Sequence, residues 1–249
     1  MTAELKSSAG QQSMAEASER SLIGLLLVVT FTTGVMDAVS VLGLGHVFTA
    51  NMTGNVVFLG FALAGAPGYA PWVYVAALTA FLGGAVIGGR LGRRFDARRS
   101  RWLLSVALIE TGLFFAAALV ARGYQWQPFV ASGRAYLLIA FTALAMGMRN
   151  ATVRRLGVAD LTTTVLTMTL TGLGADSRLA GGTDVRWQRR VASVAVLLAG
   201  AALGALLVGE VGLVWPLILS GAITLLAMLI YVASQQPLKS KQAAGKSSP

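Results

Sequence analysis

The sequence predicts an all-α polytopic membrane protein with six transmembrane helices. We expect these helices to form two inverted three-helix repeats, each with a short broken or re-entrant helical segment. Composition is the first observation behind this prediction, because 55% of the 249 residues are apolar and only 12% are charged, whereas soluble domains have roughly 25% charged residues. The second is a series of apolar segments, and the third is the distribution of positive charge between them. This composition excludes a soluble globular protein and a largely disordered chain.

Eight apolar segments follow one another between polar chain ends. A hydrocarbon core of ~30 Å requires about 20 helical residues. The first, third, fourth, seventh and eighth segments approach or reach this length. The fifth reaches it only when residues 133–151 are included. The second and sixth are short and rich in polar side chains, so we expect them to re-enter the membrane rather than cross it. In chain order the segments span residues 22–44, 48–66, 72–89, 102–121, 135–148, 161–173, 191–208 and 213–232.

The positions of lysine and arginine favour six spans with both chain ends in the cytoplasm. Cytoplasmic loops of membrane proteins carry the excess of these residues. Six spans place 18 of the 20 inside, including six arginines in residues 90–101 and seven, assigned to a loop region, in residues 149–190. Eight crossing segments would divide the charges 11 to 9, and a seven-span alternative with the N-terminus outside would divide them 16 to 4. We therefore expect a multi-pass protein of the bacterial inner membrane with cytoplasmic termini.

These segments divide the chain into four parts. We expect a polar cytoplasmic tail at residues 1–21, a first membrane repeat at 22–122, a second repeat at 133–233 and a disordered basic tail at 237–249. The five tryptophans lie at predicted span ends or in the loop between the repeats, which agrees with interfacial aromatic belts.

The two halves repeat each other at a distance of about 114 residues. Matched loops carry opposite charge bias, as two homologous halves of three spans must when they lie in opposite orientations. Inverted repeats with broken helices are a recurrent design of secondary transporters. The glycines of the repeat also predict close helix packing, within or between protomers. The matched positions are Gly34 with Gly147, Asp37 with Asn150, Gly84 with Gly200, and Gly88 with Gly204.

Asp37 and the polar run that follows it form the main candidate site for a substrate or an ion. An ionisable group inside a span is costly unless it is paired, hydrated or protonated. Asp37 is therefore either a substrate, cation or proton site, or a hydrogen-bonding group that only fixes packing. The run of Asn51, Thr53, Gly54 and Asn55 permits a broken helix that presents backbone groups to a solute. The alternative is a cap that satisfies its own backbone.

The sixth segment offers a second half for this site. Helical spacing places Asp160, Thr164, Thr167 and Thr171 on one face, although threonine hydroxyls also bond the preceding helical turn. We expect the two polar segments to meet at the interface of the repeats, near the bilayer midplane. The residues expected to line this shared cavity are Asp37, Asn51, Asn55 and Thr167.

Two further titratable residues have alternative interpretations. Glu110 lies near the middle of the fourth segment, and it is either a second proton-linked group beside Asp37 or a paired buried carboxylate. His46 lies at the outer edge of the second segment, where a single histidine is more often structural than a proton carrier.

The sequence favours neither enzymatic nor metal chemistry. Cysteine is absent and His46 is the single histidine, so thiolate sites, multi-histidine metal centres and serine–histidine hydrolases are not expected. We predict no cofactor and no nucleic-acid partner, because the arginines at 90–101 are typical of an orientation signal. The expected partners are the lipid bilayer, an unidentified small solute and a second copy of the chain in a homo-oligomer.

Two stretches resemble the YoaK-like family of bacterial membrane proteins, domain of unknown function 1275. Residues 34–60 read GVMDAVSVLGLGHVFTANMTGNVVFLG and are similar to its opening signature, and residues 147–173 read GMRNATVRRLGVADLTTTVLTMTLTGL and resemble its second motif. The resemblance covers most of residues 22–232 and implies an inner-membrane protein with about six spans. It implies no reaction. The positions that match the family motifs are Asp37, Phe48, Asn51, Thr53, Gly54, Asn55, Asn150, Thr163 and Thr167.

We expect this protein to be a small secondary transporter or permease, with Asp37 as a candidate proton-coupling residue. The internal repeat, the two polar segments and the buried acid support this expectation. A channel-like pore is an alternative in which the same polar segments line a continuous path. A non-transporting scaffold or assembly factor is another, in which these residues only stabilise the fold.

Overall fold

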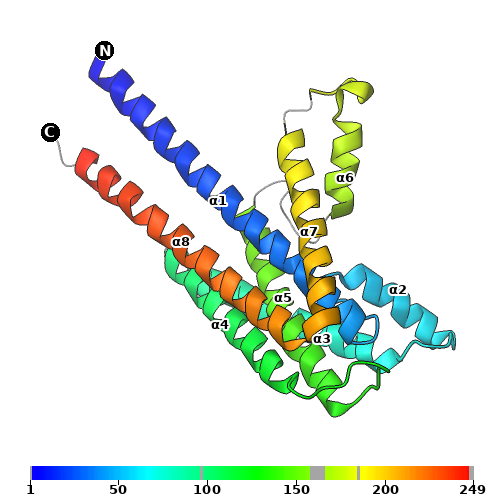
Figure 1. Ribbon diagram of the computed structural model, residues 1–249. Helices are drawn as coiled ribbons and strands as arrows, with labels where there is room; N and C mark the ends of the chain where they lie inside the picture. The colour runs from blue at the N-terminus through cyan, green and yellow to red at the C-terminus, as the bar shows by residue number, and fades with distance from the viewer. Residues whose placement is uncertain (1, 96–97, 158–165, 184–185, 247–249) are drawn as a thin grey trace.

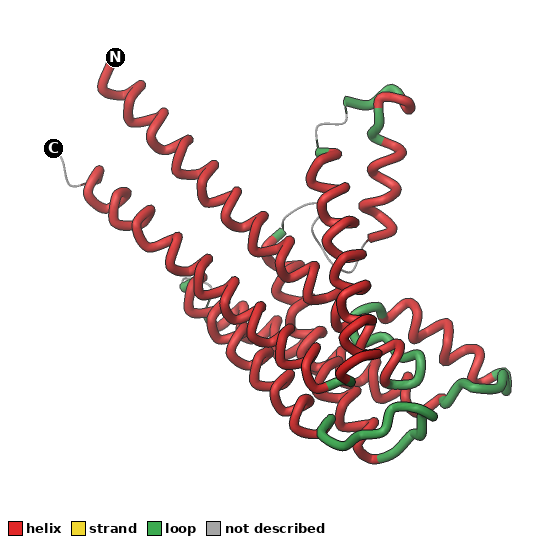
Figure 2. The backbone as a smooth tube through the Cα atoms, viewed as in Figure 1, coloured by secondary structure: helices red, strands yellow, loops and turns green. Residues whose placement is uncertain are grey.

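The structure, a computed structural model, describes residues 2–95, 98–157, 166–183 and 186–246. Within these ranges every regular element is helical (Figures 1 and 2). The elements are α1 (Thr2–Gly43), α2 (Met52–Leu63), α3 (Pro71–Arg94), α4 (Arg99–Val120), α5 (Gly133–Leu156), α6 (Leu166–Ala175), the 3₁₀ turn η1 (Arg178–Ala180), α7 (Trp187–Val211) and α8 (Val214–Lys246).

The predicted number of spans is confirmed. The helices α1, α3, α4, α5, α7 and α8 are long and apolar enough to cross a membrane. By contrast, α2 has 12 residues and α6 has 10. At a rise of 1.5 Å per residue their lengths are only about 18 and about 15 Å, and a bilayer core is ~30 Å thick. The seven-span and the eight-span alternatives both require the second segment to cross, and α2 is too short for this.

Several helices extend beyond the predicted apolar segments. The helix α1 begins at Thr2 and α8 ends at Lys246, so helical structure continues where polar tails are expected from the sequence. The helix α5 continues to Leu156 and stops before Gly157, whose φ of 67° is a left-handed conformation that suits glycine. The predicted positions Asp160, Thr163 and Thr164 lie outside the described residues.

The long helices form two bundles, and each bundle contains three long helices and one short one. In one bundle α5 packs against both α3 and α4, and α2 lies on α3. In the other α1 packs against both α7 and α8, and α6 lies on α7. The bundles meet where α4 packs along α8 and where α1 touches α5 (Figure 1). Each bundle therefore combines helices from both halves of the sequence.

Glycines allow backbone-to-backbone contact inside both bundles. At four of them a Cβ atom would overlap a backbone carbonyl oxygen on the facing helix. The contacts repeat across the halves: the α1 and α5 residues involved are 113 positions apart, and the α3 and α7 residues are 116 apart. Gly88 and Gly204 make a further matched pair of close contacts, with Met148 and Val35. The four contacts are Gly84 with Leu144 and Gly147 with Phe81, between α3 and α5, and Gly200 with Phe31 and Gly34 with Leu197, between α1 and α7.

Two hydrophobic cores fill the bundles at different depths. The terminal core lies toward the chain ends and includes Leu26, Leu103 and Val153. The distal core lies at the opposite end and includes Tyr74 and Phe114, and also Leu138 and Leu217. Because apolar packing is divided in this way, a layer between the cores is available for polar side chains.

We predict that Gly84→Ala and Gly200→Ala each destabilise the protein strongly. The new methyl group would force apart two helix backbones, and overpacking of this kind costs about 1–3 kcal/mol or more. Gly112→Ala is the matched control, since a Cβ at this exposed mid-helix position meets nothing within 4 Å. The control variant should be as stable as the parent or more stable. Thermal unfolding in detergent measures these effects, and equal melting temperatures for all three variants would contradict the close contacts.

Candidate functional site

An ion pair lies at the centre of the membrane-spanning region. Arg149 on α5 and Glu110 on α4 are each only 2% exposed. The Nε of Arg149 donates to Glu110 Oε1 at 2.7 Å, and Nη2 donates to the same oxygen. Glu110 lies halfway along α4, so the pair is far from either membrane surface. The interpretation of Glu110 as a paired buried carboxylate is therefore the one that its contacts support.

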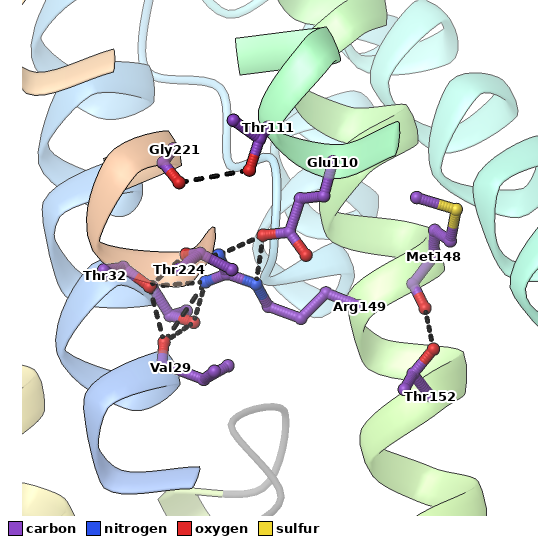
Figure 3. A network of polar contacts seen from close by, with 10 residues as sticks. Val29, Thr32, Glu110, Thr111, Met148, Arg149, Thr152, Gly221 and Thr224 are labelled. Atoms are coloured by element: carbon purple, nitrogen blue, oxygen red, sulfur yellow. Dashed lines mark hydrogen bonds and ion pairs between the residues drawn. The ribbon is translucent and has the colours of Figure 1, made fainter. Parts of the chain in front are cut away.

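The other donors of Arg149 reach three threonines and one backbone carbonyl group. Its Nη1 donates to Thr32 Oγ1 and Thr33 Oγ1, both at 3.0 Å, and to the Val29 carbonyl at 3.1 Å. Its Nη2 also donates to Thr224 Oγ1 at 3.0 Å (Figure 3). We call the set of Arg149, Glu110, Thr32, Thr33 and Thr224 the Arg149 network. It joins α1, α4, α5 and α8, two helices from each bundle.

The Arg149 network occupies the layer between the two hydrophobic cores. Along α4, Val106 belongs to the terminal core and Phe114 to the distal core, with Glu110 between them. The Phe114 ring also faces the guanidinium at 5.8 Å. A lone charge at this depth is unfavourable, and removing one partner of a buried ion pair costs about 3–5 kcal/mol. Each charge of the pair therefore depends on the other.

Arg149 is the residue that the sequence prediction misplaced. Its assignment to a loop region is wrong, because α5 continues through it to Leu156 and its side chain is buried. The physical reason is that an arginine can lie inside an apolar helix when its N–H donors are hydrogen-bonded. Here the Glu110 carboxylate faces the guanidinium group and accepts two of these bonds. The available signal was Glu110, since an acid in the middle of a span requires a cationic partner nearby.

Asp37 is a second acid inside the spans, and its surroundings differ from those of Glu110. It lies on α1 one helical turn beyond Thr33, and its side chain is partly buried. Its Oδ1 atom is buried and has no hydrogen-bond partner among the described residues. Its backbone carbonyl accepts a bond from Ser40 Oγ at 3.2 Å. An unpartnered carboxylate oxygen at this depth makes Asp37 a candidate site for a proton, a cation or a polar solute.

Asn55 closes the turn that leads into α2. Its Oδ1 accepts from the Phe48 backbone N–H at 2.9 Å, and its Nδ2 donates to the Phe48 carbonyl at 2.6 Å. Gly54 lies under the Phe48 ring, where a Cβ would approach a ring carbon to 2.6 Å. Asn51 and Thr53 are exposed. The contacts of this run therefore match a cap that satisfies its own backbone.

The two polar segments do not meet. The helix α2 lies on α3 and α6 lies on α7, and within the described ranges α2 and α6 share no contact (Figure 1). Thr167 on α6 is exposed, whereas Asn150 follows Arg149 on α5 and is partly buried. The predicted shared cavity of Asp37, Asn51, Asn55 and Thr167 is therefore wrong. The reason is that each short helix packs on the long helix that follows it.

Comparison with known proteins places the chain in a family. The family model described as "Protein of unknown function (DUF1275)" matches residues 25–230. The chain belongs to the DUF1275 family. The matched range includes every residue of the Arg149 network as well as Asp37.

One curated relative of this DUF1275 chain is the "UPF0700 transmembrane protein YoaK" of Bacillus subtilis (strain 168). The two sequences are 32% identical over 155 residues, a stretch that covers 61% of this chain and 65% of the relative. The chain thus spans just under two thirds of the relative's length. No solved structure matches this chain.

We predict that Arg149 and Glu110 are strongly coupled in stability. Arg149→Met and Glu110→Leu each leave one charge buried without its partner, so each should cost about 3–5 kcal/mol. The double variant should cost far less than the sum, because no charge then remains. Methionine is a suitable replacement because it occupies the matched position of the other half. This residue, Met36, lies 113 positions before Arg149 and is fully buried on α1.

A double-mutant cycle of thermal unfolding in detergent measures this coupling. Glu210→Leu is the control, since it removes an exposed carboxylate at the end of α7 and should change stability by less than about 0.5 kcal/mol. Additive losses for the two network variants would show that the charges do not depend on each other.

Proposed function

We propose that this DUF1275 protein is a secondary transporter for a small solute. The observation that carries the proposal is the matched packing of its two bundles. The glycine contacts between α1 and α7 have counterparts between α3 and α5, which supports an internal repeat with a two-fold relation between its halves. Transporters built in this way bind their substrates near the bilayer midplane, and they work by rocking one unit against the other.

The interface between the bundles has the features that such a motion requires. Inside the bundles α1 touches α7 and α3 touches α5 through backbone atoms at glycines, so in this proposal each of these pairs moves as a rigid unit. Across the interface the polar contacts between described residues are hydrogen bonds from Arg149 to threonine hydroxyl groups and to one carbonyl group, and one bond from Thr111 Oγ1 to the Gly221 carbonyl at 3.1 Å. These neutral acceptors can be exchanged for water without separating an ion pair, so the interface can open reversibly.

Asp37 is the residue that we assign to coupling. It lies on α1, one turn from the threonines that bind Arg149, and its unpartnered Oδ1 is available to a proton or to a cationic group of the solute. Glu110 has a different role in this proposal. Its Oε1 accepts two donors from Arg149, so it holds the guanidinium in place and does not carry the transported proton.

The charges at the helix ends support an orientation in the bacterial inner membrane. The end that carries both chain termini also carries the arginines at the end of α3, the start of α4, the end of α5 and the start of α7. By the positive-inside rule this end faces the cytoplasm.

We predict that proteoliposomes containing the protein take up at least one solute from a panel of cations, amino acids, sugars and organic acids, and that a pH gradient changes the rate. Asp37→Asn keeps the shape of the side chain and should abolish this dependence while the melting temperature stays close to that of the parent. Glu210→Gln neutralises an exposed acid and should leave uptake unchanged. If the folded parent protein moves no solute, the transporter proposal is wrong. Single-channel conductance would instead indicate a pore.

Reporter fusions test the orientation separately. Positions at the basic end should read cytoplasmic, since positive charge is retained on that side. A periplasmic reading of the N-terminus would contradict this orientation. The fusions expected in the cytoplasm follow Arg99, Arg155 and Lys241, and those expected in the periplasm lie near Gly68, Gln125 and Gly212.

A further inference from the structure

A lipid-facing groove lies between α4 and α8 at the end of the molecule opposite the chain termini. It has a volume of about 260 Å³ and is lined by apolar side chains and one arginine. Phe115 and Leu119 form its exposed wall, at 41% and 60% exposure, and Ala118 forms its floor, at 4%. The small side chain of Ala118 keeps the groove open. The lining residues are Phe115, Ala118, Leu119, Arg122, Val214 and Ile218.

Three of the lining residues follow helical spacing along α4 and the turn after it. Phe115, Leu119 and Arg122 lie at intervals of four and three residues, which places them in one stripe along α4. The Arg122 N–H bonds the Leu119 carbonyl at 3.3 Å, so the turn continues past the last residue of α4. The seven steps of 1.5 Å from Phe115 to Arg122 give this stripe a length of about 10 Å, which is about two thirds of one leaflet of a ~30 Å core.

Arg122 stands at the headgroup end of this groove. It is exposed, and its guanidinium group makes no hydrogen bond or ion pair with any residue in the described part of the chain. The exposed Trp215 at the start of α8 marks the same interfacial level, as tryptophans do in aromatic belts. An arginine at a membrane boundary extends its guanidinium toward phosphate groups, which it binds through paired hydrogen bonds.

We propose that this groove binds one phospholipid, with an acyl chain against Phe115, Ala118 and Leu119 and the phosphate on Arg122. Charge complementarity selects the ligand, since an apolar channel that ends in an unpaired guanidinium matches an acyl chain that ends in a phosphate. Lipid headgroups are also the anions present at this depth in a bilayer. The site is separate from Asp37 and from the Arg149 network, so it stands independently of the transport proposal.

Photolabelling in nanodiscs tests the site. The discs contain phosphatidylcholine and a small fraction of phosphatidylglycerol that carries a diazirine on its acyl chain. In the parent protein we expect the label on peptides that contain Phe115, Leu119 or Ile218, in excess over the lipid-facing surfaces of α3 and α7. Arg122→Gln should lower this labelling by at least about tenfold, because a hydrogen bond to a charged group contributes at least that factor.

Arg134→Gln is the matched control, since Arg134 is a second exposed arginine at the same end but does not line the groove. It should leave labelling unchanged. Ala118→Phe fills the floor of the groove and should lower labelling while Arg122 is retained, and its melting temperature reports whether the fold is intact. Labelling spread evenly over all lipid-facing helices, or equal losses in the Arg122 and Arg134 variants, would overturn the proposal.

Discussion

The structure depends on the need to neutralise one buried guanidinium group. Arg149 lies in the part of the protein that is surrounded by hydrocarbon, where an unpaired arginine is unstable and water is scarce. Its donors must therefore be satisfied by protein, and the acceptors come from α1, α4 and α8. Three helices from distant parts of the chain are fixed against α5 because one side chain has several donors to satisfy.

This requirement also explains how packing is distributed around the network. The terminal core and the distal core lie on either side of it, and each consists of ordinary aliphatic and aromatic contacts. The two long helices that contribute no residue to the network, α7 and α3, are held instead by contacts at glycines, against α1 and α5 respectively. Membrane helices have no hydrophobic driving force for association, so close van der Waals contact and buried hydrogen bonds are the two means left.

Much of the fold could be predicted from the sequence, and the limits have physical causes. The six spans follow from apolar length and from the position of basic residues, both of which are local properties of the chain. The burial of Arg149 could not be predicted in this way, since it depends on Glu110 and on threonines of two other helices. Asn55 shows a different limit. An amide that binds a solute and an amide that closes a turn onto Phe48 have the same residue type and spacing, and only coordinates distinguish them.

The pairing of helices across the two halves constrains how the protein is made. The partner of α1 is α7, which leaves the ribosome only after most of the chain has been synthesised. Until then the face of α1 that carries Gly34 lacks the helix that packs against it. Glu110 likewise enters the membrane before Arg149. The packing of α1 and the hydrogen bonds of Arg149 are therefore complete only when the last two long helices, α7 and α8, have been inserted.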